Sequence, residues 1–203
     1  MPVSISESLP LVLGSASPRR REILANLRIP FRVLPADVPE EVRPDEAPEA
    51  FSARIVSDKL AGVAGRARAE ARAALLVADT IVVVDGDILN KPSDYDDAER
   101  LLGRIVGRSH IVFTRYAIGA ADGALLAART VESEVWLRAA SAAEIRGYAR
   151  TGEGLDKAGA YAIQGIGAFL IERIRGSYTN VVGLPACEVV SDLLAAGLLE
   201  SFP

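Results

Sequence analysis

Hydrophobic residues in the first half of the chain fall into short continuous runs and into stripes with helical spacing. Continuous apolar runs are typical of buried strands, and apolar residues repeated every three or four positions are typical of helices. This pattern predicts strands at residues 11–13, 31–35 and 77–84 and helices at residues 18–27 and 48–74. The intervening residues 36–48 are rich in proline and acidic side chains, which predicts a loop.

A β-hairpin is expected in the middle of the chain. Asp85-Gly86 is a strong signal for a tight turn between two strands. A two-residue turn there places Thr80 opposite Lys91 and Asp79 opposite Pro92. A bulged turn shifts the register by one residue, and in either case Asp79 and Lys91 come close together.

The second half of the chain adds hairpin strands and capped helices. Ser93 is expected to cap a helix that stops at Gly107, and Ser141 with Glu144 forms a capping box for a helix that ends near Gly152. The remaining predicted elements are strands at 109–119, 125–138 and 168–174, a glycine-rich loop at 156–167 and a C-terminal helix from Pro185. We therefore predict an α/β protein with a mixed twisted sheet and flanking helices. We expect a single domain over residues 1–203, in which residues 1–10 are a tail that can be flexible.

The most informative segment is the strand–turn–helix junction at residues 11–24. Ser17 is a favoured N-cap, and Pro18 suits the first helical position because its missing N–H would be unpaired there. Three arginines, Arg19–Arg21, occupy the first helical turn, where positive charge is unfavourable and open N–H groups attract anions. We favour a phosphate-bearing ligand here over three solvated charges, and expect one of the three to be solvated. The segment matches neither the P-loop nor the dinucleotide-binding pattern.

Composition narrows the classes of function. The net charge of −4 over 203 residues does not predict a broad surface for nucleic acid or anionic membranes, so any positive potential must be local. No apolar run approaches the length of a membrane span, and we see no signal peptide. The single cysteine, Cys187, fits a reducing cytoplasm and is interpreted as a small core residue. The single histidine, His110, excludes a His-rich zinc site, disfavours a Ser-His-Asp triad and is interpreted as structural.

Asp79 is the strongest candidate for catalysis. It interrupts an otherwise apolar strand, and a carboxylate there must be paired, bind a metal or face a cleft at the strand end, because burying it alone is costly. The alternative is an aspartate that caps a nearby loop. Glu40 or Glu41 of the acidic loop could supply a second carboxylate, and oxygen ligands with few histidines favour Mg²⁺ or Mn²⁺ over zinc.

Basic and amide side chains supply candidate contacts to phosphate and to a base. Of the 23 basic residues only three are lysines, at positions 59, 91 and 157, and a compact ammonium suits a point contact to phosphate. Gln164 offers a donor and an acceptor to a base edge, whereas Tyr161 fits a structural role as well as a ligand contact. The residues alone thus predict a small α/β enzyme that acts on a phosphorylated small molecule with a divalent cation.

Four segments of the chain follow one another as they do in a known family: Ser15–Arg20, Ala78–Val82 with Asn90–Pro92, Asp156–Gly165, and Gly176–Pro185. On these segments the chain resembles the Maf family of nucleoside triphosphate pyrophosphatases, from about Leu11 to Pro185. Lys59 and Glu40 also fall where the family has a lysine on its second helix and a glutamate in a loop. The resemblance implies a fold related to the inosine triphosphatase-like enzymes, with two lobes around a cleft, and often a homodimer.

The resemblance also implies the reaction, which is hydrolysis between the α- and β-phosphates to give a nucleoside monophosphate and pyrophosphate. Arg19, Thr80 and Gln164 match the branch that hydrolyses dTTP and UTP, rather than the branch that prefers 7-methyl-GTP. Arg115 and Ala160 stand where glycine is common in the family, and such departures can change the substrate preference. The implied role is the removal of non-standard or excess nucleotides.

Our mechanistic hypothesis makes Asp79 the general base and has Glu40 help it to hold the metal. The metal and nearby cations offset the charge on the triphosphate and the leaving pyrophosphate, which is the largest catalytic contribution in such transfers. The expected contacts to phosphate come from Ser15, Arg20, Lys59 and Lys91.

Two other functions stay open at the level of sequence. One is a pyrophosphatase for 7-methyl-GTP or another modified nucleotide. The other is a non-catalytic regulator of cell division that binds nucleotide or a protein partner, which Asp79 disfavours because binding phosphate needs no carboxylate base. The expected partners are a nucleoside triphosphate and a second copy of the chain, without nucleic acid or membrane, in the cytoplasm.

Overall fold

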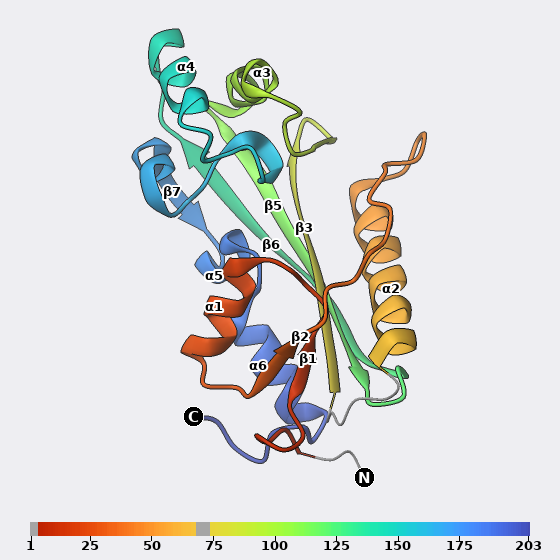
Figure 1. The fold of residues 1–203 in the computed structure, drawn as a ribbon. Helices are drawn as coiled ribbons and strands as arrows, with labels where there is room; N and C mark the ends of the chain where they lie inside the picture. The colour runs from red at the N-terminus through yellow and green to blue at the C-terminus, as the bar shows by residue number, and fades with distance from the viewer. Residues whose placement is uncertain (1–3, 68–73) are drawn as a thin grey trace. The chain divides into compact units, whose positions relative to one another are not determined.

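The strands of the chain assemble into a mixed sheet (Figure 1). This computed structural model describes residues 4–67 and 74–203, and within them seven strands pair in the order β2-β1-β3-β5-β6-β7, with β4 beside β3. The strands are β1 (Leu11–Leu13), β2 (Phe31–Val33), β3 (Ala74–Val84), β4 (Asp87–Leu89), β5 (Ser109–Ala120), β6 (Leu125–Leu137) and β7 (Ile171–Arg175). The helices are α1 (Pro18–Asn26), α2 (Pro48–Arg66), α3 (Tyr95–Ile105), α4 (Ala142–Arg150), α5 (Tyr178–Val182) and α6 (Ala186–Ala195), with 3₁₀ helices η2 (Ala158–Ala160) and η3 (Gly165–Leu170). Strand β1 is parallel to both neighbours, whereas β4 and β7 are antiparallel to theirs, which confirms the predicted α/β class with a mixed sheet.

The chain divides into two compact units. Unit 1 comprises the described residues of Met1–Asp79, together with Thr114–Thr130 and Gly183–Pro203. Unit 2 comprises Thr80–Phe113 and Val131–Val182. Strands β3, β5 and β6 therefore supply residues to both units. The expected single domain and the expected cleft between two lobes stay predictions.

In unit 1, helix α2 lies on one face of the sheet, and α1 and α6 lie on the other (Figure 1). Strand β1 is buried at every position between its parallel neighbours β2 and β3. This burial on both faces explains why its sequence is a continuous apolar run. One side of α2 supplies Val56, Leu60 and Val63 to a core that includes Leu75 and Val77 of β3.

The strand–turn–helix junction forms as predicted. The Ser17 hydroxyl accepts a hydrogen bond from the Arg20 N–H at 3.4 Å, and Pro18 is the first residue of α1. The turn packs tightly at Gly14, where a Cβ would lie 2.6 Å from Val63 and 2.7 Å from Val77. A side chain at this turn would push β1 away from α2 and β3, so glycine is required there.

In unit 2, the hairpin between β3 and β4 has the register expected of a two-residue turn. The described pairs run from Val84↔Asp87 to Val82↔Leu89. Asp79 belongs to unit 1 and Lys91 to unit 2. The predicted proximity of Asp79 and Lys91 assumes that the same register continues beyond the described pairs, so it stays a prediction.

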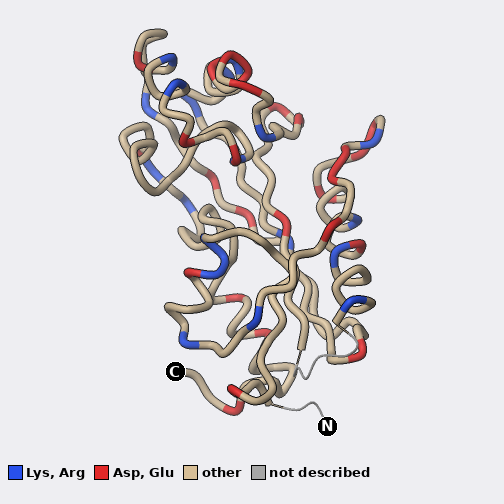
Figure 2. Tube along the Cα trace, in the orientation of Figure 1, with Lys and Arg blue, Asp and Glu red and all other residues tan. Residues whose placement is uncertain are grey.

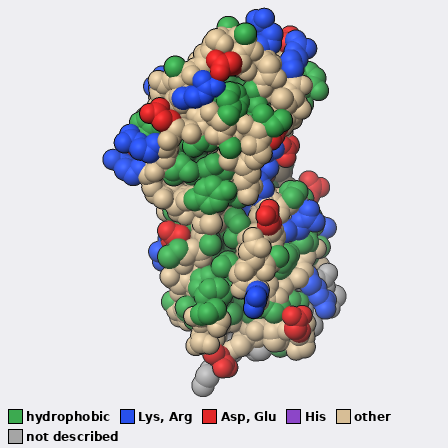
Figure 3. All heavy atoms as spheres, turned by 90° about the vertical axis from the view of Figure 1, so that its left-hand side faces the viewer, with side chains coloured by type: hydrophobic (Ala, Val, Ile, Leu, Met, Phe, Trp, Pro, Cys, Tyr) green, Lys and Arg blue, Asp and Glu red, His purple; other side chains and the backbone are tan. Residues whose placement is uncertain are grey.

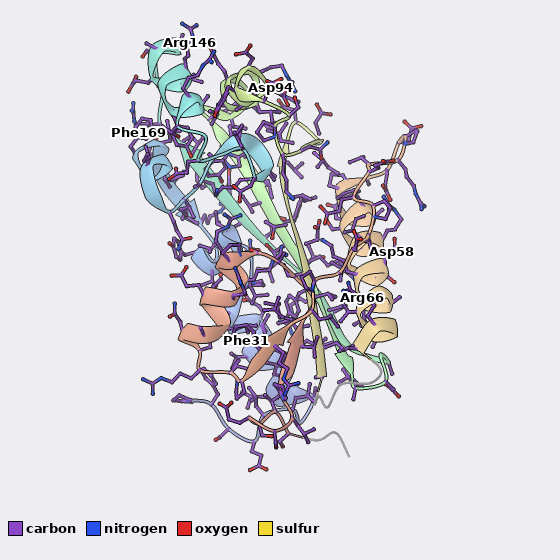
Figure 4. The ribbon with its side chains drawn as sticks, in the orientation of Figure 1. Phe31, Asp58, Arg66, Asp94, Arg146 and Phe169 are labelled. Carbon is purple, nitrogen blue, oxygen red and sulfur yellow. The ribbon has the colours of Figure 1, made fainter. Side chains whose placement is uncertain are left out.

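Local capping chemistry sets the starts of the helices in unit 2. The predicted capping box of α4 is present, with Ser141 Oγ accepting from the Glu144 N–H at 3.3 Å and Glu144 Oε2 accepting from the Ser141 N–H at 2.8 Å. Helix α3 is capped by Asp94, which is labelled in Figure 4, and not by Ser93 as predicted. The reason is that Asp94 accepts from the Asp97 N–H at 2.8 Å, while the Ser93 N–H donates to Asp97 Oδ2 at 3.0 Å.

Several predicted boundaries are wrong, and β2 ends at Val33 rather than at residue 35. Helix α2 ends at Arg66 rather than near Ala74, and Ala74 instead begins β3, where it pairs with Leu11. The residues between, 68–73, lie outside the described ranges. The strand predicted from residue 168 begins at Ile171, because residues 165–170 form η3.

The tail before β1 contacts the segment that follows α6. In the tail before β1, the Ile5 N–H donates to the Leu198 carbonyl at 2.8 Å. Cys187 is exposed, contrary to the prediction of a core residue, because α6 turns Val189 and Leu193 inward instead. Acidic and basic residues are interspersed in both units (Figure 2). Among the described residues, no helix has the length and apolar character needed to cross a membrane.

Candidate active site

The ammonium of Lys59 lies between two carboxylates in unit 1. Its Nζ donates to Asp79 Oδ1 at 2.8 Å and is 2.7 Å from Glu40 Oε1. Lys59 is only 6% exposed and Asp79 only 8%, so their ion pair is shielded from water. The buried carboxylate is therefore paired, as its cost of burial demands. Asp79 does not end its strand, however, because β3 continues to Val84.

The periodicities of α2 and β3 bring this pair together. On β3, residues two apart share a face, so Asp79 lies on the same face as Leu75 and Val77. That face packs against α2, and Lys59 lies among the buried residues of that helix. The sequence thus places one lysine in the apolar stripe of a helix and one aspartate in the apolar face that it covers.

Arg20 forms a second buried cationic group in unit 1. Its guanidinium donates to Ser15 Oγ at 2.9 Å through one terminal nitrogen and to the Gly183 carbonyl at 2.8 Å through Nε. Ser15 is also tied to the start of α1, where its hydroxyl accepts from the Ser17 N–H at 3.3 Å. Arg20 is only 9% exposed, so it is not the solvated surface charge of the alternative interpretation.

The two cationic groups share one electrostatic environment. Burial lowers the pKa of Arg20, whereas the nearby carboxylates of Asp79 and Glu40 raise it and Arg19 lowers it further. An arginine stays protonated under such shifts because its pKa lies so far above neutrality. Part of the negative charge that offsets the basic turn of α1 therefore comes from within the chain, where the sequence had suggested only a ligand.

The predicted site residues are divided between the two units. Six of them belong to unit 1: Ser15, Arg19, Arg20, Glu40, Lys59 and Asp79. The other three belong to unit 2, where Thr80 lies on β3, Lys91 is exposed after β4, and Gln164 precedes η3. That these three join the Lys59 site stays a prediction. Arg21, the third arginine of the turn, is exposed, as expected for one of the three.

The donor set around Lys59 fits a hard divalent cation. Asp79 and Glu40 direct carboxylate oxygens at one point, which the Lys59 ammonium occupies in this structure. Mg²⁺ is commonly held by one or two carboxylates together with water and substrate phosphates. In residues 4–67 and 74–203, no cluster of three or more His, Cys, Asp or Glu residues is arranged to hold a metal. A cation at this site would thus depend on the two carboxylates and on the phosphates of the substrate.

Sequence reasoning missed two groups that shape the candidate site residues. One is the Gly183 carbonyl that holds Arg20. The other is Glu153, whose carboxylate binds the backbone next to Gln164. The sequence does not indicate which backbone carbonyl will accept a hydrogen bond from a distant arginine. A single glutamate after a helix is typical of a solvated residue.

His110 forms a buried pair with Tyr161 in unit 2. His110 is 2% exposed and Tyr161 is 6% exposed, and His110 Nε2 lies 2.8 Å from the Tyr161 hydroxyl. The rings meet edge to face, and no residue in the described ranges hydrogen-bonds His110 Nδ1. Both side chains therefore pack inside unit 2, which agrees with the structural role predicted for His110. Burial raises the pKa of the Tyr161 hydroxyl and lowers the pKa of His110 to about 4.

This buried imidazole predicts a loss of stability in mild acid. Below its ordinary pKa of about 6.5 the unfolded chain binds a proton at His110 that the folded chain does not bind until the pH nears 4. Stability should therefore fall as the pH drops through this window, by about 2 kcal/mol between pH 7.5 and pH 5 in urea unfolding. The His110→Gln variant, which retains a hydrogen-bonding group, should show a much flatter profile, and an equal slope in both proteins would contradict the assignment.

Almost the whole chain is similar in sequence to known proteins. Residues 10–196 match a family model described as Maf-like protein. A relative from Geobacter metallireducens named dTTP/UTP pyrophosphatase is 52% identical over 195 residues, covering 95% of this chain and 99% of the relative. Relatives of the same name from Geobacter sulfurreducens and Myxococcus xanthus are 49% and 47% identical, each over 93% of this chain and over 97% and 93% of the relative.

A solved structure titled Nucleoside-triphosphatase / dITP/XTP pyrophosphatase, from Mycobacterium abscessus, aligns with 94% of each chain at 13% identity. Its TM-score of 0.42 is too low to support an inference about this chain. The family model and the relatives, by contrast, extend over almost the whole sequence. The chain belongs to the Maf family.

Proposed function

We propose that this chain is a nucleoside triphosphate pyrophosphatase that hydrolyses dTTP and UTP. Water is added across the bond between the α- and β-phosphates, so the products are a nucleoside monophosphate and pyrophosphate. The observation that carries the proposal is the Lys59 ammonium, which lies between the carboxylates of Glu40 and Asp79. The same two carboxylates also act on the buried guanidinium of Arg20. The relatives at 47–52% identity that bear this activity in their names support the choice of substrate.

Asp79 acts as the general base in this proposal. Its carboxylate accepts the proton of the attacking water, and the contact with Lys59 fixes its orientation beforehand. Lys59 and Arg20 offset the charge that builds on the bridging oxygen and the leaving pyrophosphate, as preorganised cations do in phosphoryl transfer. The Ser15 hydroxyl accepts from Arg20 and retains its own proton for a phosphate oxygen.

Asp79 and Glu40 are the residues that would hold a divalent cation, Mg²⁺ or Mn²⁺. When bound, the cation supplies positive charge to the phosphates of the substrate. Among the substrate contacts that we propose, Lys91 contacts phosphate, and Arg19, Thr80 and Gln164 recognise the base.

A panel of nucleotides tests the activity. The full chain is incubated with dTTP, UTP, dCTP and 7-methyl-GTP in Mg²⁺ or Mn²⁺, and pyrophosphate is measured as phosphate released by an added inorganic pyrophosphatase. We expect dTTP and UTP to be the best substrates, with no phosphate released when the coupling enzyme is left out. Preference for 7-methyl-GTP would favour the modified-nucleotide function, and nucleotide binding without turnover would favour a regulator.

We also propose that the chain forms a homodimer in the cytoplasm, as the family resemblance implies. Hydrophobic side chains reach the surface in several patches (Figure 3), and such patches are common where proteins associate. Light scattering coupled to size exclusion should give the mass of two chains. A mass of one chain across the accessible concentration range would contradict the dimer.

A further inference from the structure

The Glu153 carboxylate binds the backbone of the loop that carries Gln164. Its Oε1 accepts from the Ile166 N–H at 2.8 Å, and its Oε2 accepts from the Gly167 N–H at 2.7 Å. The same Oε2 accepts from the Tyr148 hydroxyl at 2.9 Å. Hydrogen bonds to a charged acceptor are about twice as strong as those between neutral groups, so this carboxylate is a firm anchor.

Tyr148 holds the same loop on the other side of Gln164. Its hydroxyl donates to Glu153 and accepts from the Ala162 N–H at 3.0 Å. Tyr148 is 3% exposed at the end of α4, so its ring cannot swing away. Gln164 thus lies between backbone groups that are fixed two positions before it and two and three positions after it.

The loop also packs closely against these two side chains. Gly165 has a φ of +77°, and a Cβ there would lie 2.2 Å from Glu153 Oε1. A Cβ at Gly167 would lie 2.5 Å from the Tyr148 hydroxyl oxygen. The backbone therefore rests directly on the acceptor atoms, which leaves little freedom for the segment. Gln164 itself has extended backbone angles and remains partly exposed.

We propose that Glu153 and Tyr148 are positioning residues that fix Gln164 for recognition of the base. This inference rests on the proposed function, in which Gln164 reads the pyrimidine. Thymine and uracil present an oxygen at position 4 where cytosine presents an amino group, and an amide discriminates between them only if it is held in place. Binding groups need to be fixed to about 0.5 Å for such selectivity, which a free loop does not provide.

The ionisation of Glu153 agrees with this role. Burial alone would raise the pKa of the carboxyl group, but the hydrogen bonds from Gly167, Ile166 and Tyr148 outweigh it and lower the pKa. Glu153 is thus an acceptor at both oxygens at neutral pH. In Glu153→Gln, one of these acceptors becomes an amide N–H₂ that faces a backbone N–H, while the shape of the side chain is kept.

The primary test measures base selectivity in a double-mutant cycle. In Glu153→Gln the ratio of kcat/KM for dTTP over dCTP should fall by about tenfold, as expected when a hydrogen-bonding group loses its alignment. In a Gln164→Ala background the same change should have no further effect on the ratio, because Glu153 acts through Gln164. An unchanged ratio in the single variant, or a further loss in the double variant, would overturn the proposal.

Two additional measurements distinguish a role in positioning Gln164 from a general effect on folding, and one of them does not depend on catalytic activity. Amide hydrogen exchange at Ile166 and Gly167, measured without nucleotide, should be faster in Glu153→Gln, and unchanged exchange would contradict the anchor. Glu144→Gln is the matched control, because Glu144 also binds a backbone N–H in unit 2 but caps α4. It should lower the melting temperature without changing the dTTP/dCTP ratio, and a changed ratio there would contradict the assignment to Glu153.

Tyr148→Phe provides an independent variant if Glu153→Gln does not fold. It removes the contact to the Ala162 N–H and one of the three hydrogen bonds to Glu153. The ratio of kcat/KM for dTTP over dCTP should fall in this variant as well, and an unchanged ratio would overturn the role of Tyr148. If the wild-type chain hydrolyses neither dTTP nor UTP, the proposed function is wrong. If it hydrolyses them and the change at Glu153 does not alter the selectivity, only the present inference is wrong.

Discussion

Asp79→Asn should lower kcat for dTTP hydrolysis by about 10²–10⁴-fold, the range that a general base contributes. Asparagine has the same shape and its amide oxygen still accepts the hydrogen bond from Lys59, but it cannot take a proton from water. The cation is kept at a saturating concentration, because Asp79 is also one of the two residues proposed to hold it. Steady-state kinetics on the pyrophosphate release assay measures the effect, and circular dichroism verifies that the variant is folded.

Asp192 provides the matched control for Asp79. It is a 9% exposed carboxylate in the same unit, and it accepts from the Tyr116 hydroxyl and from Arg129. Asp192→Asn should cost stability in the same way as Asp79→Asn and leave kcat within about threefold, because surface and core changes away from the site act on folding. A near-normal kcat in Asp79→Asn, or an equal loss in both variants, would refute the catalytic role.

Local chemistry explains which parts of the fold could be predicted from the sequence. The two-residue turn at Asp85-Gly86 determines the hairpin register because only a few turn types fit two twisted strands. The capping box at Ser141 and Glu144 forms because both partners lie within one helical turn. The start of α1 at Ser17 and Pro18 likewise depends on residues that are adjacent in the sequence.

The errors arise where tertiary contacts override local preference. Residues 48–74 have the alanine and arginine content of a continuous helix, but Ala74 pairs with Leu11 and is drawn into the sheet. Ser93 and Asp94 are equally good caps by type, and the choice between them depends on which one reaches the Asp97 N–H. Such outcomes depend on which of several possible partners a residue contacts in the folded chain, and the hydrophobic periodicity of the sequence does not indicate which partner is preferred.

The candidate site shows the same limit. Asp79 could be singled out as a lone carboxylate in an apolar strand, but nothing in the spacing of residues says that Lys59 and Glu40 meet it. Those three residues come from a strand, a helix and a loop, and the family resemblance supplied their association. Glu153 lay outside the prediction because its function depends on the backbone N–H groups of a loop more than ten residues later.

Lys59→Met should reduce kcat/KM for dTTP by about 10²–10³-fold, which is typical for removal of one preorganised group that stabilises the transition state. Methionine keeps the length and apolar stem of the side chain but removes the charge that lies between Asp79 and Glu40. The variant should also lose up to about 3 kcal/mol of stability, the low end for breaking a buried ion pair, since the Glu40 side chain is 42% exposed and can turn toward water.

The Lys59→Met variant also tests whether Asp79 and Glu40 bind a divalent cation in addition to their contact with the Lys59 ammonium. Without the ammonium, the carboxylates of Asp79 and Glu40 repel each other, and a divalent cation can take the place of the ammonium. Mn²⁺ should therefore raise the melting temperature of Lys59→Met more than that of the wild-type chain. Arg129→Met is the control, because it removes the cationic partner of Asp192 in the same unit. It should show neither the loss of kcat/KM nor the added response to Mn²⁺. If Mn²⁺ stabilises all three proteins equally, the two carboxylates do not form the cation site.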